Sequence, residues 1–137
     1  MDTSTAFGQR VATRLANDQV IWLATVDGYG TPQPVPVWFY WDGHTVLVYS
    51  QPDQPKLRNI ARNHRVSLNF NSDFHGGDVV VLVGDAALDP AASPADQHQA
   101  YVEKYAGGIE SISMTPASFA AAYSVAVRVT PTKVRGH

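Results

Sequence analysis

The sequence predicts a mostly β domain of the α+β class, in which about six antiparallel strands are accompanied by a few helices. Short apolar or alternating runs recur along the chain, and Gly, Pro and Asp residues separate them. The regular β-α-β alternation that builds a parallel sheet is missing. A small β-barrel or sandwich with helices at its corners accounts for both observations.

Length and composition indicate one folded domain over residues 1–137. Hydrophobic residues make up 45% of the chain and charged residues 16%, as in an ordinary packed globule. No stretch approaches the roughly 18 apolar residues that span a bilayer. The first residues show no basic region followed by an apolar core, so we expect no secretory signal and a cytoplasmic protein.

Three function classes are disfavoured by composition. The chain has no cysteine, which removes disulfides, thiolate nucleophiles and Cys-ligated metals. Its five histidines form no closely spaced pair of the HExxH kind, so we expect no metal site. The net charge of −2 provides no basic field for nucleic acid.

The N-terminal half is predicted to be a helix followed by an antiparallel meander. Residues 5–17 have the apolar spacing of a capped amphipathic helix, and 20–26 form a mostly apolar strand that ends in a glycine-rich turn. The next strand, 31–41, contains three alternating prolines, which lack ladder donors and therefore require an edge position or a bulge. An Asp-Gly pair then turns the chain into a strand over 44–50.

The second half is predicted to complete the sheet. Residues 66–70 alternate apolar and polar side chains, 79–83 form a continuous apolar strand, and 123–130 alternate again. Gly84, just after the apolar strand, predicts a bulge or tight bend.

Helices are also expected after residue 50. One spans about 55–63, and another begins at Pro94 and stops at Gly107-Gly108. A third, short helix follows Thr115-Pro116.

The segment Ser50–Asn59 is the best candidate for a binding site. It follows a predicted strand and opens a helix, and the first N–H groups of a helix lack intrahelical partners and favour anions. Ser50 offers a hydroxyl and Lys56 a positive charge, and Asn59 shares a helix face with Lys56. A solvated helix face is the alternative interpretation of the same spacing.

Several motifs together resemble a known family. They are Gly30-Thr-Pro-Gln-Pro-Val-Pro-Val-Trp-Phe39, the spacing Ser50…Lys56…Asn59, Val66-Ser-Leu68 and Val129-Thr-Pro-Thr-Lys-Val-Arg-Gly136. With them, nearly the whole chain resembles the pyridoxamine-phosphate-oxidase-like split β-barrel family. Within it, the chain looks like the small actinobacterial branch of oxidoreductases that use the deazaflavin coenzyme F420.

The resemblance implies a six-stranded antiparallel split β-barrel with peripheral helices. It also implies a homodimer with cofactor sites at the interface, lined by both chains. The cofactor ring would lie along Pro36, Val37 and Trp38. The phosphate would lie by Ser50 and Lys56, and Asn59 completes the predicted cofactor-binding set.

The function that the resemblance implies is hydride transfer between F420 and a small unsaturated or quinone-like substrate. Gln51 and Gln54 stand where a second cation would be expected for FMN, and a single phosphodiester needs fewer cations than a phosphomonoester. No residue stands out as an acid-base catalyst. Two alternatives remain open, an FMN-binding oxidoreductase of the same fold and a non-enzymatic carrier of F420 or a flavin-type cofactor.

Overall fold

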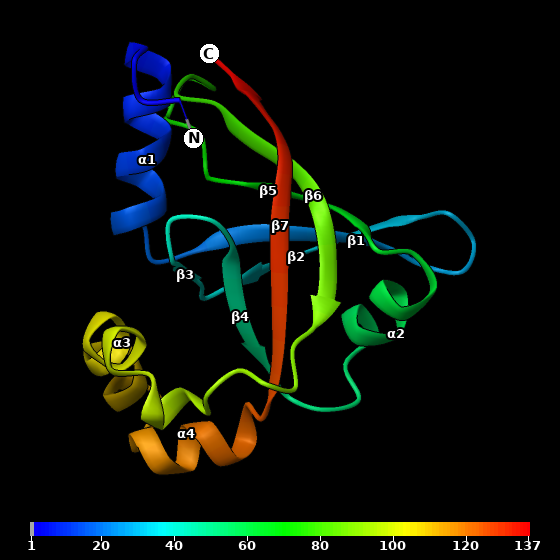
Figure 1. The fold of residues 1–137 in the computed structure, drawn as a ribbon, viewed down its shortest axis with the longest axis vertical. Coiled ribbons are helices and arrows are strands. Elements are labelled where there is room, and N and C mark those ends of the chain that lie inside the picture. Colours follow the sequence, from blue (N-terminus) through cyan, green and yellow to red (C-terminus); the bar gives the residue numbers. More distant parts are fainter. Residues whose placement is uncertain (1) are drawn as a thin grey trace.

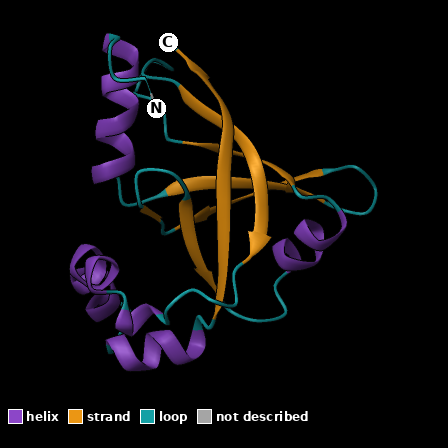
Figure 2. Cartoon of the chain, in the orientation of Figure 1, coloured by secondary structure: helices purple, strands orange, loops and turns teal. Residues whose placement is uncertain are grey.

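The computed structural model describes residues 2–137, which form one antiparallel sheet that curls into a half-barrel, with helices at its rims (Figures 1 and 2). The sheet has seven strands in the order β2-β1-β5-β6-β7-β4-β3. The strands are β1 (Ile21–Val26), β2 (Pro32–Val37), β3 (Tyr40–Trp41), β4 (Val46–Ser50), β5 (Arg65–Asn69), β6 (Val80–Leu88) and β7 (Val125–Gly136). The helices are α1 (Ala6–Asn17), α2 (Pro55–Arg62), α3 (Gln99–Ser111) and α4 (Pro116–Ala122). No helix within residues 2–137 has both the length and the apolar character to cross a membrane.

The sheet has one strand more than the sequence predicts, because the segment 31–41 is divided into β2 and β3. At the division, the Phe39 N–H donates to the Tyr105 hydroxyl at 2.8 Å. The same hydroxyl donates to the carbonyls of Phe39 and Gln19, at 2.9 and 2.7 Å respectively. A side chain of α3 therefore holds the backbone where a ladder would otherwise continue, so the prediction of six strands was wrong.

The edge position predicted for the proline-containing strand is confirmed. β2 is the first strand of the sheet and pairs only with β1, with Pro32, Pro34 and Pro36 opposite Val26, Ala24 and Trp22. Prolines at every second position remove N–H donors from one side of the strand. This arrangement leaves the ladder to β1 intact and discourages a further strand from pairing with β2.

A bulge between β6 and β7 occurs where the sequence predicts it. The register shifts between Val83 and Gly84, and a Cβ on Gly84 would lie only 2.4 Å from the Thr130 carbonyl oxygen. The close approach of the two backbones therefore requires glycine. β7 continues to Gly136 as a full partner of β6, well beyond the strand 123–130 that alternation predicts.

The helix predictions are confirmed at α1 and α2 and need correction at α3. Thr5 caps α1 by accepting the Gly8 N–H at 2.9 Å. α3 begins at Gln99 rather than Pro94, because His98 Nδ1 accepts the Tyr101 N–H and caps the helix there. The helix also continues through Gly107-Gly108 to Ser111.

β4 is buried on both faces and separates two hydrophobic cores. Val46 and Val48 belong to the main core inside the curled sheet, and Leu47 and Tyr49 belong to a second core. The buried partners of the second core are Ala95, Tyr101, Tyr105, Ile109 and Phe119, which come from α3, α4 and the turn before α3. Figure 1 shows α3 and α4 together near one end of the molecule, with α1 at the other end. The second core is aromatic and lies beside the predicted binding corner.

Candidate functional site

A cavity of about 320 Å³ opens where β2 and β4 end and α2 begins. Five of the six predicted site residues line it, from three separate stretches of the chain: Pro36, Val37, Trp38, Ser50 and Lys56. β2 and β4 lie toward opposite edges of the sheet and do not pair, so the curl of the sheet brings their ends to the same cavity (Figure 1).

The remaining wall of the cavity consists of Tyr49, Gln51, Gln54, Tyr101, Ile112, Phe119 and Tyr123, four of which are aromatic. The sequence placed Gln51 and Gln54 at this corner but did not predict the contribution of the helices. Tyr101 lies in the helix predicted from Pro94, and Phe119 in the short helix predicted after Thr115-Pro116. The aromatic content of these helices is the one signal in the sequence that points to a ring-binding wall.

Trp38 is a fixed part of the wall. Its ring stacks with Tyr105 at a centroid distance of 4.7 Å and an interplanar angle of 8°, and with Phe119 at 5.6 Å and 20°. The indole also packs on the backbone of α3, since a Cβ on Gly108 would lie 3.0 Å from its Cη2 atom. These contacts hold Trp38 in one orientation beside the cavity.

Ser50 is almost fully buried, with 1% of its surface exposed. Its hydroxyl donates to the Gln51 carbonyl at 2.8 Å. In this arrangement the Ser50 oxygen is free to accept a hydrogen bond. Donation to a ligand requires the hydroxyl to leave Gln51.

Among residues 2–137, Lys56 is the only charged residue in the lining of the cavity. Its side chain is half-buried, and the burial lowers its pKa. The helix terminus itself offers few donors, because Pro55 has no N–H and the Leu57 N–H donates to the Gln54 carbonyl at 3.0 Å. The ammonium group therefore supplies most of the positive potential, and an anion beside it offsets the loss of hydration.

Asn59 is not part of this cavity. It is 3% exposed, and its Nδ2 donates to the Thr25 hydroxyl of β1 at 3.0 Å. Its Oδ1 accepts a hydrogen bond from Arg62 at 3.0 Å. The side chain connects α2 to the sheet, so in this structure Asn59 orients the helix that carries Lys56.

The cavity can bind and orient a ligand, but the described part of the chain places no carboxylate or imidazole in its lining. Burial raises the pKa of the Tyr49 and Tyr101 hydroxyls, which therefore stay protonated near neutral pH. Within residues 2–137, no group of three or more metal-ligating side chains is placed to hold a metal ion.

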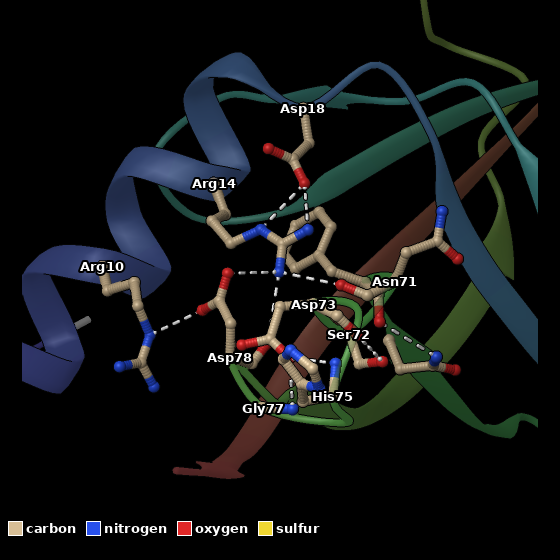
Figure 3. Close-up of polar contacts among 11 residues, drawn as sticks. Arg10, Arg14, Asp18, Asn71, Ser72, Asp73, His75, Gly77 and Asp78 are labelled. Atoms are coloured by element: carbon tan, nitrogen blue, oxygen red, sulfur yellow. Dashed lines mark hydrogen bonds and ion pairs between the residues drawn. The ribbon is translucent and has the colours of Figure 1, made fainter.

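A separate polar cluster around Arg14 is structural (Figure 3). The guanidinium donates to Asp18 Oδ2 from two nitrogens, at 2.8 and 2.6 Å. It also donates to the carbonyls of Asn71 and Asp78, at 3.0 and 3.2 Å. Asp73 closes the loop by accepting the Gly77 N–H at 2.7 Å. The cluster ties α1 to the loop before β6 and uses the hydrogen-bonding capacity of Arg14 within the chain.

Comparison with known proteins identifies the family. The family model described as pyridoxamine 5'-phosphate oxidase matches residues 7–137, and the chain belongs to this family of split-barrel proteins. The resemblance drawn from the sequence motifs is thereby confirmed at the level of the family. No curated protein matches the sequence.

Solved structures agree with this assignment. A structure titled F420 reductase is 25% identical, with a TM-score of 0.69, and the match covers 90% of this chain and 94% of that one. An FAD-binding protein from Mesorhizobium loti is 17% identical, with a TM-score of 0.67 and coverage of 93% and 89%. The heme storage protein HutZ from Vibrio cholerae is 15% identical, with a TM-score of 0.66 and coverage of 96% and 95%. The last two likenesses concern the fold.

Proposed function

We propose that this protein is an F420-dependent oxidoreductase that transfers a hydride between the deazaflavin and a small unsaturated or quinone-like substrate. The observation that carries the proposal is the lining of the cavity, which combines a single cation, Lys56, with a wall of aromatic and apolar side chains. Such a lining suits a flat ring attached to one weakly charged phosphate group.

The roles of the residues follow from their positions. Lys56 would bind the phosphate, and Ser50 would either accept from the ligand or turn away from Gln51 to donate. Pro36, Val37 and Trp38 would form the side of the cavity that the ring contacts. The bound deazaflavin supplies the hydride chemistry, and the protein orients the ring and excludes water.

The choice of F420 over FMN rests on charge. FMN carries a phosphomonoester that is close to a dianion at neutral pH, whereas the phosphodiester of F420 is a monoanion. Gln51 and Gln54 line the cavity where further cations would help a dianion. The 25% identity to a protein titled F420 reductase supports the same choice.

We also propose that the functional unit is a homodimer. The residues Leu23, Leu68 and Leu82 form a buried row across the sheet. The neighbouring rows face the other way, and they include Trp22, Ala24, Val81 and Val83, which are only partly covered. A second copy of the chain would cover this apolar outer face. Pro36 lies in the row of Trp22 and also lines the cavity, so the partner would border the ligand.

The proposal is tested by mixing the purified protein anaerobically with reduced F420 and a naphthoquinone. We expect the absorbance of oxidised F420 to return faster than without protein, and reduced FMN to be used poorly. Tight F420 binding without turnover across a panel of quinones and enones would instead support a carrier. A protein that purifies with a flavin spectrum would overturn the choice of F420.

A further inference from the structure

The hydroxyl of Tyr101 is a buried polar group without a hydrogen-bond partner in the chain. The residue lies in the middle of α3 and is 0% exposed. Its hydroxyl oxygen has no partner within residues 2–137. Buried hydroxyls are normally paired, because an unpaired one loses its hydrogen bonds to water on folding.

The described groups packed around Tyr101 make no hydrogen bond with its hydroxyl. Its aromatic neighbours are Tyr49, Tyr105, Phe119 and His98, with ring centroids 4.8, 4.9, 6.0 and 6.2 Å away.

These neighbours make other hydrogen bonds. The Tyr49 hydroxyl donates to the Ser93 carbonyl at 2.7 Å, and the Tyr105 hydroxyl bonds to the backbone of Gln19 and Phe39. His98 Nδ1 accepts the N–H of Tyr101 itself. Tyr101 also lines the cavity, where a bound ligand would bring an acceptor.

We infer that the Tyr101 hydroxyl is a specificity-determining hydrogen-bond donor for the ligand in this cavity, left unpaired until an acceptor oxygen of that ligand arrives. The inference rests on the proposed function, since F420 and FMN both carry carbonyl oxygens on their rings. It adds a recognition group from α3 to the cavity that Lys56 also lines. An unpaired buried hydroxyl lowers the stability of the free protein. Such a cost is expected at a binding site, where the same group contributes to ligand affinity.

The state of the hydroxyl supports donation. Burial raises the pKa of Tyr101 far above neutral, so the group keeps its proton at physiological pH. It therefore acts as a hydrogen-bond donor and not as a source of the proton in the reaction. A site built to donate to a ligand oxygen also rejects ligands that lack it.

The test compares wild type with Tyr101→Phe, which removes the oxygen and keeps the ring. Without ligand, we expect the variant to melt roughly 2–6 °C higher, because it no longer buries an unpaired hydroxyl. The dissociation constant for the preferred cofactor, F420 or FMN, should rise about threefold to tenfold, as for the loss of one neutral hydrogen bond. Tyr105→Phe removes a paired hydroxyl and should melt below wild type. Tyr29→Phe, at a residue that is 97% exposed, should change neither quantity.

Three results would overturn the inference. If Tyr101→Phe binds the cofactor as tightly as wild type, the hydroxyl does not contact the ligand, while the proposed function stands. If the variant melts below wild type, the hydroxyl has a partner in the free protein. If wild type binds neither F420 nor FMN, the proposed function fails, and the role of Tyr101 fails with it.

Discussion

Lys104 is a residue whose charge is costly in the folded protein. Its Nζ donates to the Phe39 carbonyl at 2.9 Å and lies 3.7 Å from the centre of the Phe39 ring. Burial lowers the pKa of Lys104 from 10.5 to about 8, although Asp18 opposes the shift. Lys104 and Tyr105 together hold the backbone beside Trp38, so this charge lies behind the wall of the cavity.

The lowered pKa predicts a pH dependence of stability. Between about pH 8 and 10.5 the unfolded chain binds a proton at Lys104 that the folded protein has lost, so the free energy of unfolding rises with pH. We expect urea denaturation to show this rise from about pH 8 to 9.5, below the titration of ordinary tyrosines. In Lys104→Met the rise should be smaller. Equal slopes in the two proteins would show that Lys104 has an ordinary pKa.

Asn59 is predicted to contribute to stability through Thr25. Asn59→Ala leaves the Thr25 hydroxyl, which is 0% exposed, without the amide that donates to it. The expected cost is about 1–3 kcal/mol in the free energy of unfolding, measured by urea denaturation. A variant of unchanged stability that no longer binds cofactor would instead favour the direct cofactor contact implied by the family resemblance.

The predicted site residues that line the cavity lie close together in the chain. Ser50 and Lys56, six residues apart, were found because a strand end and a helix start place both at one corner. Tyr101 and Phe119 reach the same cavity from more than forty residues further along the chain, and no periodicity predicts such a contact. Asn59 shares a helix with Lys56, yet its amide donates to the Thr25 hydroxyl. The spacing of residues along the helix does not predict this contact.

At the scale of elements, α3 carries two adjacent glycines in different surroundings. A Cβ on Gly107 would meet nothing within 4 Å, whereas one on Gly108 would lie 3.0 Å from Trp38. In the sequence, the pair predicts a helix end, because glycine commonly ends helices. In the structure, the helix continues to Ser111, and the absence of a side chain at Gly108 permits the close approach of the Trp38 indole.

This difference predicts opposite effects for a matched pair of variants. Gly107→Ala should raise the free energy of unfolding by about 0.5–1 kcal/mol, the gain expected for Ala over Gly within a helix. Gly108→Ala should show no such gain, because Trp38 must move away from its stacked neighbours. Thermal unfolding measures the first effect, and tryptophan fluorescence should shift only in Gly108→Ala. Equal stabilisation without a fluorescence change in both variants would contradict the packing described for Trp38.

The strands were predicted well where a feature depends on residues within the strand itself. Alternating prolines predict an edge strand, and a glycine after an apolar run predicts a bulge. Both features are present. The break between β2 and β3 was missed because its cause is the hydroxyl of Tyr105, on a distant helix. The last part of β7 was expected only as a possible edge extension over 131–137, because that segment contains a proline and shows little alternation. In the structure, residues 131–136 pair with β6 alone.

At the scale of the whole molecule, the partly covered outer face of the sheet predicts a dimer. Ala24 lies in the middle of that face, opposite Pro34 on one side and Ser67 on the other. Ala24→Arg places a charge at the proposed interface and should convert the dimer to a monomer in sedimentation experiments. Glu103→Arg, at an exposed residue of α3 rather than of this sheet face, is the control and should leave the mass unchanged. A wild type that sediments as a monomer at micromolar concentration would refute the dimer.

A contact between Lys56 and the phosphate of F420 is the feature on which the proposed function depends most. The most direct measurement is a titration of F420 and FMN, side by side, into wild type, Lys56→Ala and Arg58→Ala, which removes an exposed cation of the same helix outside the cavity. We predict tighter binding of F420 than of FMN by wild type. Lys56→Ala should lose at least about tenfold in F420 affinity, as expected for a charge-assisted contact, and Arg58→Ala should bind like wild type. Unchanged F420 affinity in Lys56→Ala would contradict the account.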